Sequence, residues 1–207
     1  MDQELSLRER KKLATRQRIS DIATGLFIER GFDAVTVAEV ARRADVSAMT
    51  VFNYFPRKED LFLDRIPQAA ELLAGAVRDR AAGEPPLAAL RRLTLRLLEE
   101  RHPLGGVGDA FAPFWRVVVD SPALRARARE GAEELERALA AALAGTGTPD
   151  PHLLAALVMA ACRTVFVTSV RRLMAGAPVD EVAQEHRLRL EAAFAALERT
   201  GLDGQHR

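Results

Sequence analysis

The sequence predicts an all-α protein of about nine helices. Apolar residues recur at helical spacing along most of the 207 residues, and segments rich in Gly and Pro separate these stretches. No segment carries a clear strand pattern, because the apolar run RVVVDSP at 116–122 is short and lies in a helical context. We therefore expect helices that pack against helices.

The first helix is expected over about residues 8–30. Its apolar residues form one stripe, and Gly31 suits the C′ position that ends a helix. The stripe consists of Leu13, Ile19, Ile22, Ala23, Leu26 and Phe27.

The beginning of the chain is basic, since residues 1–18 hold six basic and three acidic residues. The whole chain has a net charge of only +1, so any nucleic-acid footprint must be local. Two interpretations of this arm stay open. It contacts phosphates or the minor groove of DNA, or it is a solvated charged face.

Two short helices are expected next, at 37–44 and 48–54, joined by Asp45, Val46 and Ser47. Thr36 and Glu39 fit a capping box at the first start, and Ser47 is a good N-cap for the second. Two short helices with a three-residue turn predict a helix-turn-helix.

The second of these helices carries polar residues that packing alone does not require. If Val51 and Phe55 face inward, the small and amide side chains of the segment lie outside and can enter a major groove. There Asn bonds adenine bidentately, and Thr or Ala methyl groups contact the thymine methyl. Thr36 and Tyr54 offer hydroxyls to phosphates, and Lys58 adds a charge beside free N–H groups. The candidate DNA-binding residues are Thr36, Ser47, Ala48, Met49, Thr50, Asn53, Tyr54 and Lys58.

The remaining helices are bounded by caps and breaks. A helix is expected at about 57–80, where Pro67 would remove a backbone bond and introduce a kink. Ser121-Pro122 and Asp150-Pro151 each place a cap residue before a Pro that starts a helix. The last two helices are expected at about 152–174 and 178–199. Residues 153–170 come closest to a membrane span, but Arg163 near their middle favours a buried helix.

Two groups are candidates for a small-molecule site. Phe111, Phe114 and Trp115 crowd around Pro113 and form either core or a pocket wall. Arg163, as a lone charge in an apolar helix, needs a partner, which is either a structural ion pair or an anionic ligand held together with Arg116. The candidate ligand-binding residues are Phe111, Phe114, Trp115, Arg116, Met159, Cys162, Arg163 and Phe166.

Catalysis finds little support in the sequence. The four His residues are scattered without metal-ligand spacing, and no Gly-rich phosphate loop is present. The single Cys, Cys162, excludes an intrachain disulfide and fits a reducing cytoplasm, and no signal peptide is visible. Cys162 in an apolar helix fits an inert small hydrophobe. We expect no enzyme, no metal and no cofactor.

The segment GFDAVTVAEVARRADVSAMTVFNYFPRKEDLF at 31–62 closely resembles the DNA-binding domain of the TetR family of bacterial transcriptional regulators. The match runs from about Lys12 to Gln68 and places T-V-x-x-V-A, V-S, N-Y-F and K-E-x-L at the spacing of the family. Asp45 is a departure, because the family usually has Gly in this turn. Asp tolerates a left-handed backbone better than most residues, so the turn can survive.

The resemblance implies a DNA-binding domain over residues 12–72 and a C-terminal ligand-binding and dimerisation domain over 73–207. It further implies a homodimer joined by the last two helices, a small-molecule effector, and a double-stranded DNA operator that is roughly palindromic. The expected function is a cytoplasmic, sequence-specific repressor that its ligand releases from DNA. The alternative is an activator or an architectural DNA-binding protein without an effector.

Overall fold

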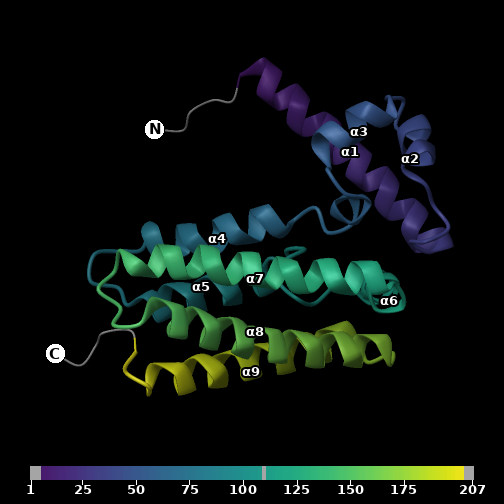
Figure 1. Cartoon of the computed structure of the whole chain (residues 1–207). Coiled ribbons are helices and arrows are strands. Elements are labelled where there is room, and N and C mark those ends of the chain that lie inside the picture. Colours follow the sequence, from purple (N-terminus) through teal and green to yellow (C-terminus); the bar gives the residue numbers. More distant parts are fainter. Residues whose placement is uncertain (1–5, 109–110, 203–207) are drawn as a thin grey trace. The chain divides into compact units, whose positions relative to one another are not determined.

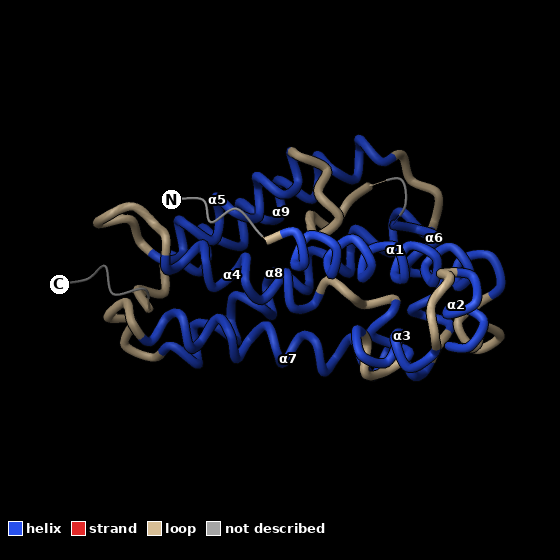
Figure 2. The backbone as a smooth tube through the Cα atoms, turned by 90° about the horizontal axis from the view of Figure 1, so that it is seen from above, coloured by secondary structure: helices blue, strands red, loops and turns tan. Residues whose placement is uncertain are grey.

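The computed structural model describes residues 6–108 and 111–202. These residues form nine α-helices and one short 3-10 helix, and they contain no strand. Figure 1 labels the α-helices, and Figure 2 distinguishes helices from loops by colour. The predicted all-α class is confirmed. The chain forms two compact units: residues up to 64 with 117–127, and residues 65–116 with 128 onward.

The first unit is built on α1 (Leu7–Arg30), α2 (Val37–Arg43), α3 (Ala48–Tyr54) and the 3-10 helix η1 (Lys58–Leu61). Helix α1 packs against α2 and η1, and α2 packs against α3. Ile19, Ala23, Leu26 and Phe27 of the predicted stripe are buried, whereas Leu13 is 53% exposed and lies outside this core. Phe27 lies at the centre of this core, with its ring centroid 5.0 Å from that of Phe32 and 5.6 Å from that of Phe62. Gly31 ends α1 at φ +84°, as predicted.

The starts of α2 and α3 follow the predicted caps in part. The Thr36 hydroxyl accepts a hydrogen bond from the Glu39 backbone N–H, and Ser47 does the same for Thr50. The capping box at Thr36 is wrong, because the Glu39 carboxylate binds the Arg30 guanidinium instead of returning to the cap. Between the helices, Asp45 has φ +52°, the left-handed conformation that this turn requires.

Residues 117–127, where α6 (Phe111–Asp120) ends and α7 (Pro122–Ala144) begins, belong to the first unit. Ser121 precedes the Pro that starts α7, as predicted, and its hydroxyl accepts from the Leu124 backbone N–H. One turn later, Arg127 Nε donates to Asp60 Oδ1 of η1 at 2.7 Å. Both side chains are largely buried, with exposed fractions of 10% and 20%.

The second unit is a helical bundle. Besides the parts of α6 and α7 outside residues 117–127, it contains α4 (Ile66–Arg78), α5 (Pro86–Glu99), α8 (Pro151–Met174) and α9 (Val179–Glu198). Helix α9 packs along both α8 and α5, and α5 also packs against α4. Apolar side chains from α4, α5, α7, α8 and α9 fill the core, among them Val77, Leu90, Leu143, Leu154 and Phe194.

The predicted kink at Pro67 is wrong. The segment expected as one helix over 57–80 is divided, because η1 ends at Leu61 and α4 begins only at Ile66. Pro67 therefore lies in the first turn of α4, where a backbone N–H has no helical partner to lose. The fixed φ of Pro suits the start of the helix and leaves the rest of α4 undisturbed.

Helix α8 is long and apolar enough to cross a membrane by length and composition alone. It lies in the bundle, where Leu154, Ala155 and Val158 are buried against its neighbours. Asp150 caps its start, with its carboxylate 2.9 Å from the Leu153 backbone N. We interpret α8 as a helix of the bundle whose remaining face is open in the single chain.

Candidate DNA-binding surface and effector site

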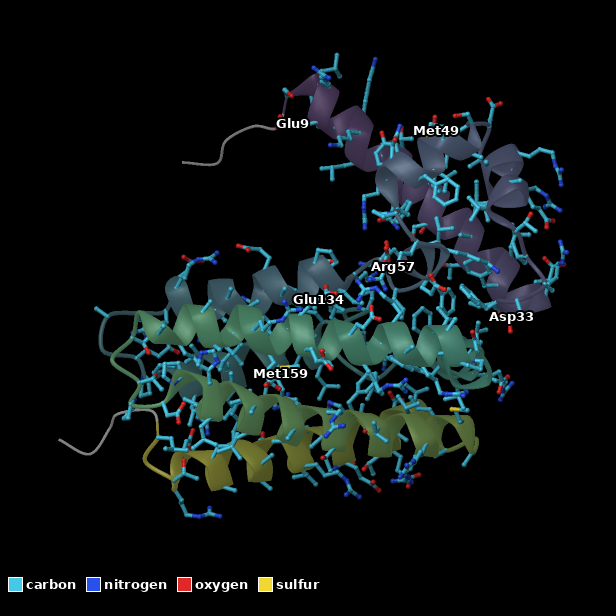
Figure 3. All side chains as sticks on the ribbon, viewed as in Figure 1. Glu9, Asp33, Met49, Arg57, Glu134 and Met159 are labelled. Carbon is cyan, nitrogen blue, oxygen red and sulfur yellow. The ribbon has the colours of Figure 1, made fainter. Side chains whose placement is uncertain are left out.

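Helix α3 divides its side chains as the sequence predicts. Val51 and Phe55 are buried, while Ala48, Met49 and Asn53 are exposed. Met49 has 69% of its surface exposed and lies on the outer side of the first unit (Figure 3). The outer face of α3 therefore presents an amide, a thioether and small groups, a set that can contact base edges.

Sequence reasoning did not assign a site role to Phe52, which is also exposed on α3. A large aromatic ring is costly to leave in water, so its exposure points to a contact outside the single chain. Position 52 follows the buried Val51, and the helical period alone would have placed Phe52 on the outer side.

The hydroxyl groups at the helix starts have partners within the chain. Ser47 Oγ lies 2.8 Å from Thr50 Oγ1 in addition to accepting the Thr50 N–H. Thr36 and Ser47 are exposed, and Thr50 and Tyr54 are half-buried. Thr36 and Ser47 thus define where α2 and α3 begin, and an exposed hydroxyl that accepts a backbone N–H can still donate its own hydrogen to a phosphate oxygen.

Lys58 points into the first unit. Its Nζ donates to the Phe32 carbonyl at 2.6 Å and lies 4.2 Å from the centroid of the Phe32 ring. Burial lowers the pKa of Lys58 from its usual value. The side chain therefore ties η1 to the end of α1 in the free protein, and its contact with phosphate stays a prediction.

The basic arm is helical where the structure describes it, and residues 1–5 lie outside the described residues. Ser6 and Glu9 form a capping box that starts α1. Arg8, Arg10, Lys11 and Lys12 are all exposed on this first stretch of α1. Figure 3 shows Glu9 at the free end of the helix. Arg16 differs, because its guanidinium binds the Asp64 carbonyl and lies 4.7 Å from the Phe55 ring.

Three of the predicted ligand-binding aromatics meet in the second unit. The ring centroid of Trp115 lies 5.0 Å from that of Phe166, and the ring centroid of Phe111 lies 6.4 Å from that of Phe166, each in an edge-on arrangement. The ring of Phe114 packs on that of Trp115, with the two ring centroids 5.5 Å apart. All four rings are only half-buried. Large aromatic side chains that a bundle leaves half-covered fit the wall of a small-molecule site.

The two arginines do not join this aromatic group. Arg116 and Arg163 are both exposed, so the expectation that Arg163 is a buried charge is wrong. Residue 163 lies on the stripe of α8 that faces away from the bundle core. The apolar sequence around Arg163 predicted burial, whereas one face of α8 is open in the single chain.

Met159 and Cys162 are half-buried and pack against the core cluster of the bundle. Burial raises the pKa of the Cys162 thiol to about 11, so the group is a neutral thiol at physiological pH. This agrees with the expectation of a small hydrophobe and offers no reactive thiolate.

Sequence reasoning missed the polar pair His186 and Ser169. His186 is only 4% exposed, and its Nδ1 lies 2.8 Å from Ser169 Oγ. Burial lowers the pKa of His186 to about 4, so the ring is neutral. The sequence contains a signal for this buried histidine, because His186 falls on the same helical stripe as the apolar Val182, Leu190 and Phe194 of α9.

A further hollow of about 530 Å³ lies along α5, lined by Glu84, Arg91, Arg92 and Glu99 among others. Arg92 forms a bidentate ion pair with Glu84, and Glu99 pairs with Arg187 of α9. The hollow is therefore bordered by ion pairs and is separate from the aromatic group. Among the described residues, no cluster of His, Cys, Asp or Glu could hold a metal ion.

Comparison with known proteins agrees with this geometry. Residues 19–64 match the family model for bacterial regulatory proteins of the tetR family. The transcriptional regulator TcmR of Streptomyces glaucescens is 32% identical over 168 residues, which cover 77% of this chain and 74% of TcmR.

Solved structures share the fold at lower identity. A TetR-family regulator from Mesorhizobium loti has a TM-score of 0.55 at 22% identity and covers 89% of this chain and 96% of its own. SmeT, the repressor of the Stenotrophomonas maltophilia multidrug efflux pump SmeDEF, has a TM-score of 0.57 at 18% identity, covering 87% and 89%. SmeT has also been solved as a complex with triclosan.

Proposed function

Because the chain belongs to the TetR family of bacterial regulatory proteins, we propose that it is a homodimeric repressor released from a palindromic operator by a small molecule. Membership makes the chain a DNA-binding transcriptional regulator and not an enzyme. The observation that carries the proposal is the helix-turn-helix, in which buried Val51 and Phe55 hold the polar face of α3 outward.

The outer face of α3 is the element that reads bases. Asn53 is exposed on it and supplies the paired donor and acceptor that adenine requires. Ala48, Met49 and Thr50 supply apolar and hydroxyl contacts, and Tyr54 and Thr36 contact phosphates beside the groove. The domain boundaries at residues 72 and 73 remain part of this proposal.

The exposed basic stretch of α1 adds contacts that do not depend on sequence. Arg8, Arg10, Lys11 and Lys12 have no ion-pair partner among the described residues, so they are available to phosphates. Such contacts release counterions, and each contributes to a linear fall of log affinity with log salt.

The homodimer is proposed to form through α8 and α9. Leu188 of α9 is 59% exposed, and Leu153 and Val167 of α8 are exposed as well. Ala160 of α8 and Ala192 and Ala196 of α9 are also exposed, which permits close approach of a second pair of helices. A two-fold dimer then places two copies of α3 on two half-sites.

The effector is proposed to bind at Phe111, Trp115 and Phe166. The half-buried state of these rings supports a ligand more than an activator or architectural protein without one. The repressor SmeT forms a complex with triclosan, which is consistent with an effector site in a protein of this fold. We place the protein in the cytoplasm, where its DNA lies.

Binding of the purified protein to DNA upstream of its own gene tests the proposal. We expect saturable binding that random DNA competes for poorly, measured by fluorescence anisotropy across salt concentration. Asn53→Ala and Tyr54→Phe should weaken it, whereas Thr94→Ala on α5 should not. Removing a bidentate base contact costs about 1–3 kcal/mol. Equal affinity of the protein for sequences selected as its operator and for random DNA would contradict sequence-specific regulation.

Lys11→Ala tests the arm in the same assay. We expect it to reduce the slope of log affinity against log salt by roughly one phosphate contact without changing sequence preference. An unchanged slope would mean that the arm is a solvated charged face and does not contact phosphates.

A further inference from the structure

Helix α3 carries no charged side chain, in contrast to the basic stretch of α1. Residues 47–56 contain no Asp, Glu, Lys or Arg. Arginine and lysine make the commonest specific contact with guanine, in which their N–H groups donate to the O6 and N7 acceptors. Helix α3 has no side chain for this contact, so a G·C pair beneath it would lack its usual partner.

The hydrogen-bonding groups of α3 leave Asn53 as the side chain that can bond a base twice. Ser47 Oγ and Thr50 Oγ1 lie 2.8 Å apart, and Ser47 Oγ also accepts the Thr50 backbone N–H. These hydroxyls therefore act on the start of the helix. The exposed amide of Asn53 carries the donor and acceptor that pair with N7 and N6 of adenine. Polar readout by α3 is directed at adenine.

Two large apolar side chains lie on the outer face of α3 beside this amide. Met49 is 69% exposed, and Phe52 is 46% exposed. They are three residues apart and are therefore neighbours on one face of the helix, and Asn53 follows Met49 by one turn. The core is formed on the opposite face by Val51 and Phe55. The exposed apolar surface is thus available for a contact outside the chain.

The major groove presents one apolar group, which is the C5 methyl of thymine. Side chains three residues apart on a helix have Cβ atoms about 5–6 Å apart. Base pairs stack about 3.4 Å apart. Met49 and Phe52 can therefore cover methyl groups in two neighbouring base pairs. Such contacts remove the apolar surface of both partners from water, which is favourable.

We propose that α3 reads a run of A·T pairs, in which Met49 and Phe52 contact thymine methyl groups and Asn53 bonds an adenine. Phe52 is thereby a specificity-determining residue for DNA recognition. The uncharged helix supplies selectivity, while the exposed basic residues of α1 supply charge for the phosphates. This inference rests on the proposed function and names the class of base pairs that each half-site contains.

Uracil tests the methyl contacts with wild-type protein, because it differs from thymine only by the missing C5 methyl. The operator is the sequence that full-length protein enriches from random DNA. Each thymine of the half-site is replaced by uracil in turn, and Kd is measured by fluorescence anisotropy. We expect two positions at which binding weakens about fourfold for each methyl removed. Uracil outside the half-sites should leave the Kd unchanged.

Cytosine and 5-methylcytosine at the same two positions separate the methyl group from the rest of the base. A C·G pair in place of T·A should weaken binding. The 5-methylcytosine base returns the methyl group to the groove, so it should bind about fourfold more tightly than cytosine. Equal affinity for the two forms of cytosine would mean that the methyl group is not read.

Protein variants assign each methyl group to a residue. Phe52→Ala should weaken binding to the thymine operator and abolish the difference between thymine and uracil at one position. Met49→Ala should do the same at the other position. Val119→Ala on α6 is the control, because Val119 is also 46% exposed, and it should keep both differences. Thermal unfolding checks that the variants fold.

Four outcomes would overturn the proposal. In the first three, uracil is tolerated at every thymine of the half-site, the half-site is built of G·C pairs, or the differences between thymine and uracil survive both Phe52→Ala and Met49→Ala. In the fourth, Phe52→Ala changes the mass in light scattering but not the affinity for DNA, which would make the apolar pair a contact between protein chains.

Selection on the same preparation separates the two claims. If a sequence is enriched but uracil is tolerated throughout, the class of base pairs is wrong and the regulator stands. If no sequence is enriched, the proposed function itself fails.

Discussion

Lys58 and Arg16 direct their charges inward in the first unit, although both belong to basic stretches of the sequence. Lys58 Nζ reaches the Phe32 carbonyl, and Arg16 reaches Asp64 and the Phe55 ring. Their long apolar stems cover aromatic surface while the charged heads find oxygen partners. A Lys or Arg near a DNA-binding helix can therefore be a structural residue first.

His186 makes folding stability depend on pH. Its pKa is about 4 in the folded protein and 6.5 as a free group, so above pH 6.5 both states are neutral and the histidine contributes nothing. As the pH falls from 6.5 to about 4, the unfolded state binds a proton that the folded state does not. Stability should fall by about 1.4 kcal/mol for each pH unit in this window.

Chemical denaturation at pH 7 and pH 5 measures this loss. We expect wild type to lose more stability than His186→Phe between the two values, by roughly 1–2 kcal/mol. The exposed His152→Phe serves as the matched control and should behave as wild type. Equal losses in wild type and His186→Phe would mean that His186 titrates normally.

Substitutions of Asp45 test the left-handed backbone conformation of the turn between α2 and α3. Its φ of +52° costs an ordinary residue about 1–2 kcal/mol, while Asp and Gly tolerate it better. Asp45→Ala should lower the free energy of unfolding by about 1 kcal/mol, and Asp45→Gly should leave it near wild type. Thermal unfolding of the two variants measures the difference. Equal stability of Ala and Gly at position 45 would show that the turn relaxes.

At the scale of elements, the ion pair of Asp60 and Arg127 joins η1 to the beginning of α7 within the first unit. Removing one partner of a largely buried pair takes the nearest opposite charge away from the other. Arg127→Met should therefore destabilise the protein by about 3 kcal/mol, whereas Arg129→Met on the exposed face of α7 should cost little.

A double-mutant cycle assigns this loss to the pair. Asp60→Asn, Arg127→Met and the double variant are compared by urea denaturation. We expect the double variant to be less destabilised than the two single losses added together, by at least about 1 kcal/mol. Additive losses would mean that the two residues stabilise the protein independently.

The helices were largely predictable from the sequence because their boundaries are local. Gly31, Ser47, Ser121 and Asp150 act on backbone groups within a few residues, so the sequence shows them directly. The division of α3 into a buried and an exposed face also followed from the helical period alone. The error at Pro67 concerned where a helix starts, which depends on η1 and the residues after it.

The surroundings of the proposed effector site were harder to predict, because contacts between helices join residues that are distant in sequence. Phe111 and Trp115 were visible as a local cluster, but the buried contact of His186 with Ser169 joins two different helices and shows only in the fold. The prediction that Arg163 is buried was also wrong. The pattern of α8 predicted a buried helix, whereas one face of that helix is open in the single chain. Only packing reveals which face that is.

At the scale of the whole molecule, the open faces of α8 and α9 predict the assembly. Ala192 and Ala196 lie one turn apart on the exposed side of α9, close to Leu188. The double variant Ala192→Glu/Ala196→Glu should place two carboxylates in the proposed dimer interface and yield monomers. Light scattering after size exclusion measures the mass. Ala141→Glu, on the exposed side of α7, is the control and should remain dimeric.

The monomeric variant should also lose affinity for an intact operator while each half-site is still bound weakly, because two copies of α3 must be held together. A dimer that survives both glutamates would place the interface on another surface of the bundle. A wild-type protein that is already monomeric would contradict the proposed assembly.

Selection from random double-stranded DNA tests the central claim most directly, because it does not depend on where the operator lies. We predict that the protein enriches a roughly palindromic sequence with half-sites about one helical turn apart, bound at least about 10³-fold more tightly than random DNA. Asn53→Ala should relax the preference at one position in each half-site. Failure to enrich any sequence, or enrichment that Asn53→Ala, Thr50→Ala and Met49→Ala all leave unchanged, would contradict recognition by α3.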